Sequence, residues 1–241
     1  MKYAIFSDMH GNLEAYESVL NDAAKENPDK YFCIGDIIGY GANPNECLNI
    51  TRTLAPVTVC GNHDWASVEL TSMEYFNEYA RQAVHWTASW LTDEDKDYIR
   101  SLRLTYADDD LTMVHGTWMR PENFDYVFDF QTASKMLKMI PTRIGFIGHS
   151  HVAGTFFIKD GQPEYSVQSK IKIERDQSYL INVGSVGQPR DGDKRASYCI
   201  WDKDKGTIEM RRVEYDIEKA KKKIIDAGLP RFLATRLSEG R

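Results

Sequence analysis

Short apolar runs alternate with helix-like patterns in the first 60 residues of the chain. The runs at 5–6, 31–34 and 57–60 predict buried strands, and apolar residues at helical spacing predict helices over 13–26 and 44–53. Strands separated by helices pair in parallel through right-handed crossovers, so all three should end on one edge of a sheet. Open α/β sheets place their ligands at that edge. We therefore expect a functional site in the residues that follow these strands.

The region at about 65–102 has the pattern of a helical insertion. One helix is predicted over 75–91, and a second begins near Asp93. The first helix places an aromatic stripe on one face, formed by Phe76, Tyr79, Ala83, Trp86 and Trp90. Such a stripe is typical of core packing, and a lid over a substrate is the alternative.

The second half of the chain has alternating patterns and many turns. Strands at 102–106 and 111–115 flank three aspartates, which are more typical of a tight turn than of a calcium loop. A helix over 130–139 and a strand over 143–147 follow. The later pattern predicts mostly antiparallel strands, near 154–158, 164–174, 178–183, 196–201 and 207–214. With a charged helix over 217–227 and a frayed tail after Pro230, we expect a single domain over 1–241.

The composition argues against several classes of protein. The 241 residues are 42% hydrophobic and 27% charged, which is typical of a globular domain. The formal net charge of -6 argues against a dedicated nucleic-acid-binding surface. No apolar run approaches the roughly 20 residues of a membrane span, and the first residues lead directly into a strand, so we expect a cytoplasmic protein. The cysteines are far apart in sequence and predict reduced core thiols: Cys33, Cys47, Cys60 and Cys199.

Side chains that bind metals follow the predicted strands. Five of the six histidines lie there, beside two aspartates and an asparagine. An Asp-x-His pair alone is more typical of a turn or a helix N-cap, but this clustering is hard to obtain from packing. Imidazole, carboxylate and amide oxygen without thiolate suit manganese, iron or zinc. The candidates are Asp8, His10, Asp36, Asn62, His115, His149 and His151. They are too many for one ion, which favours two ions about 3.5 to 4 Å apart with a shared carboxylate.

Five short motifs resemble the signature blocks of a known family. They are Asp8-x-His10, Gly35-Asp36, Gly61-Asn62-His63-Asp64, His115-Gly116 and Gly148-His149-x-His151. In this order they resemble the calcineurin-like metallophosphoesterases over residues 8–151. The resemblance implies an α/β fold, a four-layer α/β/β/α sandwich of two mixed β-sheets.

The same resemblance implies roles for individual residues. One metal would be held by Asp8, His10, Asp36 and His151, and the other by Asp36, Asn62, His115 and His149, so that Asp36 bridges the pair. His63 would stand over the metals to protonate the leaving oxygen or to stabilise charge on the phosphoryl group. Asp64 would orient the ring of His63.

A narrower resemblance concerns the small prokaryotic branch related to phosphodiesterases and diadenosine tetraphosphatases. It rests on Gly39-Tyr40-Gly41 with Asn43-Pro44, on Arg120-Pro121 and Tyr126 after the His115-Gly116 motif, and on the segment 182–190. Arg190 lies in a loop with glycine and proline and is our candidate for binding substrate phosphate, with a surface arginine as the alternative.

Two functions are compatible with these residues. The first is a dinuclear metal-dependent phosphoesterase that hydrolyses a phosphodiester or phosphomonoester through a metal-bridging water. Its partner would be a small phosphorylated substrate, with nucleotide-derived compounds among the candidates. Manganese is the expected metal, and iron, zinc, nickel and cobalt are alternatives. The second is a catalytically weak metal-binding scaffold that recruits a protein partner. A scaffold would be expected to lack a metal ligand or His63, whereas this sequence has all seven candidate ligands and His63.

Overall fold

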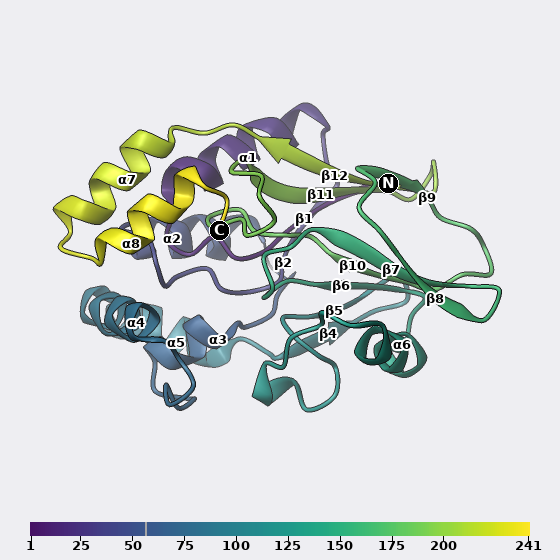
Figure 1. Ribbon diagram of the computed structural model, residues 1–241, viewed down its shortest axis with the longest axis horizontal. Coiled ribbons are helices and arrows are strands. Elements are labelled where there is room, and N and C mark those ends of the chain that lie inside the picture. The colour runs from purple at the N-terminus through teal and green to yellow at the C-terminus, as the bar shows by residue number, and fades with distance from the viewer. Residues whose placement is uncertain (56) are drawn as a thin grey trace.

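The computed structural model describes residues 1–55 and 57–241, in which two six-stranded sheets pack face to face (Figure 1). The first sheet has the strand order β3-β2-β1-β11-β12-β9. Its strands are β1 (Lys2–Phe6), β2 (Lys30–Cys33), β3 (Val57–Thr58), β9 (Lys170–Lys172), β11 (Ala196–Asp202) and β12 (Thr207–Val213). Strands β1, β2 and β3 pair in parallel, as expected, and the other neighbours pair antiparallel.

The second sheet has the order β4-β5-β6-β10-β7-β8. Its strands are β4 (Thr105–Ala107), β5 (Thr112–Val114), β6 (Ile144–Ile147), β7 (Gly154–Lys159), β8 (Gln162–Ser166) and β10 (Tyr179–Asn182). Strand β6 pairs in parallel with both β5 and β10, whereas the outer pairs are antiparallel. Both sheets are therefore mixed.

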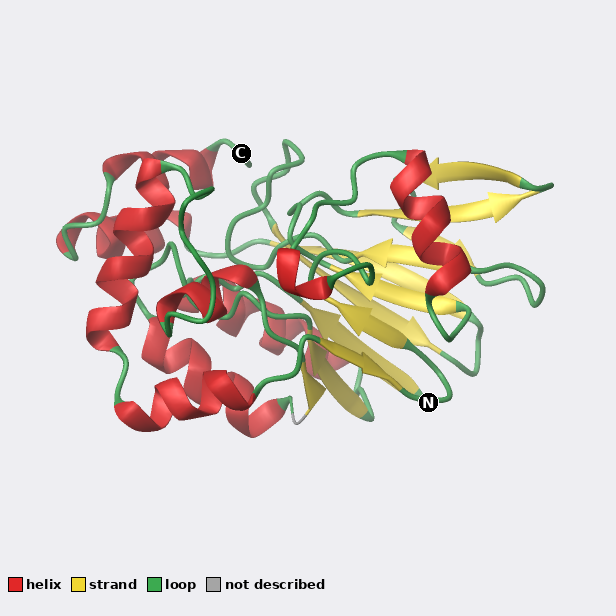
Figure 2. Cartoon of the chain, turned by 90° about the horizontal axis from the view of Figure 1, so that it is seen from below, coloured by secondary structure: helices red, strands yellow, loops and turns green. Residues whose placement is uncertain are grey.

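Helices cover the outer faces of both sheets and gather at one end of them (Figures 1 and 2). The α-helices are α1 (Leu13–Lys25), α2 (Pro44–Leu54), α3 (Asn62–Ser67), α4 (Glu78–Trp90), α5 (Asp93–Ser101), α6 (Phe130–Met139), α7 (Ile217–Asp226) and α8 (Arg231–Thr235). Two short 3₁₀ helices are η1 (Pro121–Asn123) and η2 (Arg236–Ser238). No helix in the described part of the chain is both long and apolar enough to cross a membrane.

The apolar core has one layer between the sheets and one on each outer side. In β1, Tyr3 and Ile5 join the cluster between the sheets, whereas Ala4 and Phe6 join the cluster under α1 and α2. Successive residues of a strand point to opposite faces, so a strand buried on both sides is apolar throughout. On the other side, Met136 of α6 packs on the second sheet. The predicted four-layer α/β/β/α sandwich is therefore confirmed.

The C-terminal segment corrects the prediction of a frayed tail after Pro230. It forms α8 and η2, and Leu233 and Leu237 are buried in a cluster with Ala83 of α4 and Ile224 of α7. The two leucines are four residues apart, so they lie on one face of a short helix. The segment is too short for its apolar residues to give a clear helical pattern in the sequence, and the order comes from packing.

The predicted strand at 164–174 is also wrong, because the chain changes sheets within it. Strand β8 ends in the second sheet at Ser166, and β9 begins in the first sheet at Lys170. Both strands are mostly exposed, so no alternation of buried residues marks the crossing. The prediction of reduced core thiols is confirmed, since the four cysteines are free and buried.

Candidate metal centre

The loops that follow the parallel strands meet at one end of the two sheets. Asp8 follows β1, Asp36 follows β2 and Asn62 begins α3 after β3. His115 follows β5, and the loop after β6 carries the last two histidines. All seven candidate ligands predicted from the sequence are buried. The fold therefore brings together side chains from five separate loops.

The charged and imidazole ligands fall into two adjacent groups. The ligand atoms of Asp8, His10 and His151 lie within 4.8 Å of one another, and so do those of Asp36, His115 and His149. Asp36 lies between the groups, because its Oδ2 is 3.3 Å from His115 Nε2 and 3.5 Å from His10 Nε2. One carboxylate oxygen is thus within reach of both groups.

Backbone carbonyls fix the orientation of three of the imidazole rings. The Nδ1 atoms of His10, His115 and His151 lie 3.1, 2.7 and 2.6 Å from the carbonyl oxygens of residues 38, 34 and 188, respectively. A carbonyl only accepts, so each Nδ1 carries a proton, and whenever the ring is neutral its Nε2 lone pair points into the site. The Nε2 atoms of His10 and His151 face each other at 3.1 Å. Two facing lone pairs at this distance repel each other unless a cation or a proton lies beside them.

Several polar atoms in the site are buried without a hydrogen-bond partner among the described residues. They include Asp8 Oδ1, Asn62 Oδ1 and His115 Nε2. The other oxygens of the carboxylates are used: Asp36 Oδ1 accepts from the backbone N–H of His63 at 2.8 Å, and Asp8 Oδ2 accepts from that of His149 at 3.1 Å. Leaving buried acceptors unpaired is costly, and a bound cation removes that cost. The donor set of this chain therefore fits divalent metal ions.

The loops that carry the candidate ligands adopt strained backbone conformations. Five candidate ligands have a positive φ, namely Asp8 (57°), His10 (48°), Asp36 (49°), His149 (66°) and His151 (60°). Residues other than glycine pay roughly 1 to 3 kcal/mol for such conformations, which cluster at functional sites.

Two glycines let these loops approach one another. A Cβ atom on Gly61 would lie 2.0 Å from Asp36 Oδ1. One on Gly39 would lie 2.8 Å from His63 Nδ1 and 2.9 Å from His10 Nδ1. Any side chain at either position would therefore displace a ligand or its neighbour.

Burial and neighbouring charges shift the pKa values of these histidines in opposite directions. Burial, reinforced by the charge of His115, lowers the pKa of His149 to about 3. Burial and the charge of Arg190 also lower the pKa of His151 to about 3. For His115, burial favours a low pKa, but the carboxylates of Asp36 and Asp8 outweigh it and raise the pKa to about 9. A positive charge is favoured beside the carboxylates, and the neutral imidazole is the form that binds a metal.

His63 lies beside the ligands, but its surroundings differ from those expected. Its ring packs against the rings of Tyr40 (4.4 Å between centroids), His10 (4.9 Å) and Phe76 (5.0 Å). Its Nδ1 is buried without a hydrogen-bond partner in the described residues. A ring nitrogen of His63 also lies within 4.8 Å of ligand atoms of His10 and Asp36.

The expectation that Asp64 orients the ring of His63 is wrong. Asp64 Oδ1 accepts from the backbone N–H groups of Ile37 (2.9 Å) and Ile38 (3.3 Å), and Oδ2 accepts from that of Gly61 (3.0 Å). His63 and Asp64 are in α3 rather than in a loop, so their side chains point in different directions. Asp64 therefore ties the loop that carries Asp36 to the start of α3.

Arg190 lies next to the ligands and not on the open surface. Its backbone N–H donates to the carbonyl oxygen of His151 at 3.1 Å. Its guanidinium donates to Gln188 Oε1 at 2.8 Å and to the hydroxyl of Tyr40 at 3.4 Å.

Comparison with known proteins identifies the family. The description of a calcineurin-like phosphoesterase superfamily domain matches residues 1–206. The chain belongs to this superfamily. It is therefore a phosphoric ester hydrolase by family, and the resemblance found in its five motifs is confirmed.

Relatives cover the full length of this phosphoesterase. Uncharacterized protein MJ0912 of Methanocaldococcus jannaschii is 40% identical over 99% of this chain and 98% of its own length. The crystal structure of a metallophosphoesterase from Sphaerobacter thermophilus is 38% identical, with a TM-score of 0.88 over 100% of this chain and 99% of that one. An archaeal phosphodiesterase has a TM-score of 0.50 at 14% identity, over 88% of this chain and 100% of that one, which shows a shared fold alone.

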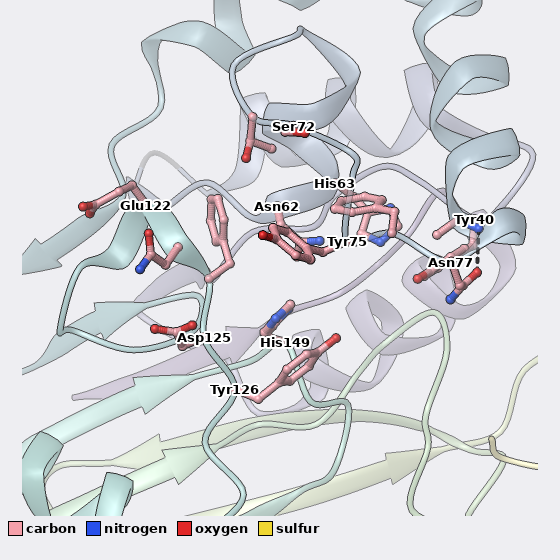
Figure 3. Close-up of a pocket in the computed structure, with 15 residues that line it drawn as sticks. Tyr40, Asn62, His63, Ser72, Tyr75, Asn77, Glu122, Asp125, Tyr126 and His149 are labelled. Atoms are coloured by element: carbon pink, nitrogen blue, oxygen red, sulfur yellow. Dashed lines mark hydrogen bonds between the residues drawn. The ribbon is translucent and has the colours of Figure 1, made fainter.

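A cavity of about 670 Å³ opens onto one side of the metal centre of the phosphoesterase (Figure 3). Asn62 and His63 line one side, and His149 and Tyr126 line the opposite side. Tyr126 stacks on His149, with 3.9 Å between ring centroids and 12° between planes. The volume is that of a site for a small molecule. The predicted aromatic stripe of the insertion has different surroundings at its two ends. Phe76 lines the cavity, which favours the alternative of a lid over the substrate, whereas Trp90 is exposed.

The sequence analysis did not identify the roles of Tyr40, Tyr126 and Gln188. Tyr40 packs on His10 and His63 and accepts from Arg190. The narrower resemblance included Tyr40, Tyr126 and Gln188 but assigned none of them a role. Tyr126 lies in an irregular segment, so no periodic pattern marks it.

Proposed function

We propose that this phosphoesterase uses two divalent metal ions. Asp8, His10 and His151 would hold one ion, and Asn62, His115 and His149 the other, with Asp36 shared. The position of Asp36 Oδ2 between the two groups, at 3.5 and 3.3 Å from their imidazoles, is the observation that carries this proposal. Manganese is the expected metal, since nitrogen and oxygen donors without thiolate suit it.

When bound, such ions polarise phosphate oxygens and acidify water, which is the chemistry that phosphate ester hydrolysis needs. Side chains of the protein would bind the phosphate and assist the leaving group. His63 faces the cavity beside the ligands, and we assign it the hydrogen bond or proton that the leaving oxygen needs. Arg190 would bind the nonbridging oxygens of the phosphate, because a guanidinium presents several donors to an oxyanion. The substrate would be a small phosphodiester or phosphomonoester in the cavity.

The alternative of a catalytically weak scaffold has less support. A scaffold does not need buried lone pairs, a strained ligand backbone and an open cavity in one place. The six candidate aspartate and histidine ligands and His63 lie close together, and Asn62 is buried and lines the cavity with His63 and His149.

Chelation and metal replacement test the proposal. Protein treated with a chelator should lose hydrolysis of bis-p-nitrophenyl phosphate and p-nitrophenyl phosphate, and added Mn²⁺ should restore it for at least one of them. Mn²⁺ without protein is the control. Protein that binds Mn²⁺ but hydrolyses neither ester faster than free Mn²⁺ would support the scaffold instead.

A further inference from the structure

Two segments outside the metal-ligand motifs contribute to the cavity beside the metal centre (Figure 3). The first lies within residues 71–77, in the connection from α3 to α4, and the second is residues 122–126, which begin in η1. The candidate ligands Asn62 and His149 line the same cavity. A phosphate held at the metal centre would therefore extend one of its ester groups towards these two segments.

Both segments present aromatic rings to the cavity. Tyr75 and Phe76 belong to the first segment, and Phe124 and Tyr126 belong to the second. Two of these rings already pack against the protein: Phe76 lies 5.0 Å from the ring of His63, between centroids, and Phe124 is buried. The two tyrosines are exposed. The cavity thus has a partly apolar lining in which two rings remain open to a ligand.

Tyr75 differs from the other rings because almost nothing in the protein covers it. It is 93% exposed, the highest value among the large hydrophobic residues of the described chain. Single exposed tyrosines are common on protein surfaces, but this one lines a cavity that reaches the metal centre. A bound ring that stacks on a tyrosine removes apolar surface of both from water. Tyr75 is therefore placed to contact a ligand and contributes little to the core.

The charged side chains at the second segment are acidic. Glu122 and Asp125 line the cavity, and none of the described residues that line it is a lysine or an arginine. Both carboxylates are exposed and lie on the side of the cavity opposite to Tyr40 and Asn77 (Figure 3). A second phosphate in this position would be repelled by the carboxylates, whereas a neutral or positively charged group would not.

We propose that this cavity binds the leaving group of the substrate and selects one that has a planar aromatic ring and no negative charge. His63, to which we assign the leaving oxygen, lines the cavity, so the group bound there is the one that departs. Tyr75 would stack on the ring, and Glu122 and Asp125 would disfavour compounds with further phosphates. This inference rests on the proposed phosphoesterase function and adds the class of substrate.

Calorimetric titration of Mn²⁺-loaded protein with phosphonates tests this inference, because a phosphonate has a stable carbon–phosphorus bond in place of the ester bond. Benzylphosphonate and cyclohexylmethylphosphonate carry rings of similar size, but only the first ring is planar and aromatic. The wild type should bind benzylphosphonate about fivefold more tightly. A carboxylate in the para position of the benzyl ring should weaken binding about threefold or more, and added salt should reduce this penalty.

Substitutions at Tyr75 should not disturb the fold, because this residue is exposed. Tyr75→Phe keeps the ring and should keep the preference for benzylphosphonate, whereas Tyr75→Leu should reduce it to about twofold or less. Tyr79→Ala is the matched control, since Tyr79 is an exposed tyrosine that is not among the described residues lining the cavity. It should keep the preference of the wild type.

A double variant tests the two carboxylates. Glu122→Gln combined with Asp125→Asn keeps the size of both side chains and removes their charge. It should abolish the penalty for the para carboxylate and change the affinity for benzylphosphonate by less than about twofold. A penalty that persists in this variant would overturn the selection against negative charge.

The other outcomes separate the two proposals. Equal binding of the two phosphonates by the wild type, no binding of benzylphosphonate, or an unchanged preference in Tyr75→Leu would overturn the aromatic site. The predicted preferences in a protein that hydrolyses neither nitrophenyl ester would support the site and contradict the proposed function. Hydrolysis of these esters without the preferences would contradict only the inference drawn here.

Discussion

The loops that carry the candidate metal ligands and the C-terminal segment are held in place by different forces. Hydrogen bonds and buried charges fix the loops, as when Asp64 binds three backbone N–H groups around Asp36. Apolar packing of Leu233 and Leu237 fixes the C-terminal segment. The loops need particular residue types at fixed spacing, whereas packing accepts many sequences. The arrangement of the loops is therefore visible in the sequence, whereas the order of the C-terminal segment, which depends on packing, is not.

Removal of the shared carboxylate tests the loops with the largest expected effect. Asp36→Ala should lose both metals and lower hydrolysis by on the order of a thousandfold or more, because both groups depend on this residue. His149→Ala should keep partial metal at the Asp8 side. Elemental analysis of dialysed protein measures both. Full metal content in Asp36→Ala would contradict the shared role of Asp36, because metal binding by the loops would then not depend on this carboxylate.

Replacement of His63 separates chemistry from metal binding. His63→Ala should keep the metal content and lower turnover about a hundredfold for a poor alkoxide leaving group. The loss should be much smaller for p-nitrophenolate, which leaves without help from an acid. Exposed His85 offers a control, since His85→Ala should match the wild type. Metal loss in His63→Ala would instead assign His63 as a ligand, in line with its position near His10 and Asp36.

A substitution that creates a cavity in the apolar cluster of the C-terminal segment tests that segment. Leu237 is buried, so Leu237→Ala should lower the free energy of unfolding by about 2 to 5 kcal/mol. Metal content at a temperature where the variant is folded should not change, because no ligand touches this residue. Urea denaturation and elemental analysis measure the two effects, with Leu70→Ala at an exposed leucine as control. Metal loss in folded Leu237→Ala would mean that the loops and the segment are not independent.

Asp64→Asn should have the smallest effect on catalysis. Its amide can accept only with one oxygen, so at least one backbone N–H loses its partner, at a cost of about 1 to 3 kcal/mol of unfolding free energy. Any loss of activity should be equal for good and poor leaving groups, because Asp64 accepts hydrogen bonds from backbone N–H groups and not from the ring of His63. A loss confined to poor leaving groups would restore the role that the sequence suggested for this residue.

Most of the fold, and the convergence of the candidate aspartates and histidines, could be predicted from the sequence. Strand-helix alternation placed Asp8 and Asp36 at the ends of parallel strands, and the strands pair as expected. The hydrogen-bond partners of Asp64 could not be predicted, because they depend on where α3 begins relative to the loop after β2. The positive φ of Asp8 and His151 leaves no trace in a sequence, since aspartate and histidine also occur in ordinary turns.

Diffraction from crystals grown with Mn²⁺, measured at the manganese absorption edge, tests the central claim most directly. The account predicts two anomalous peaks about 3.5 to 4 Å apart, with the carboxylate of Asp36 between them. One peak should lie beside Asp8 and His10, and the other beside His115. A single fully occupied peak, with Asp36 turned away from it, would contradict the dinuclear site.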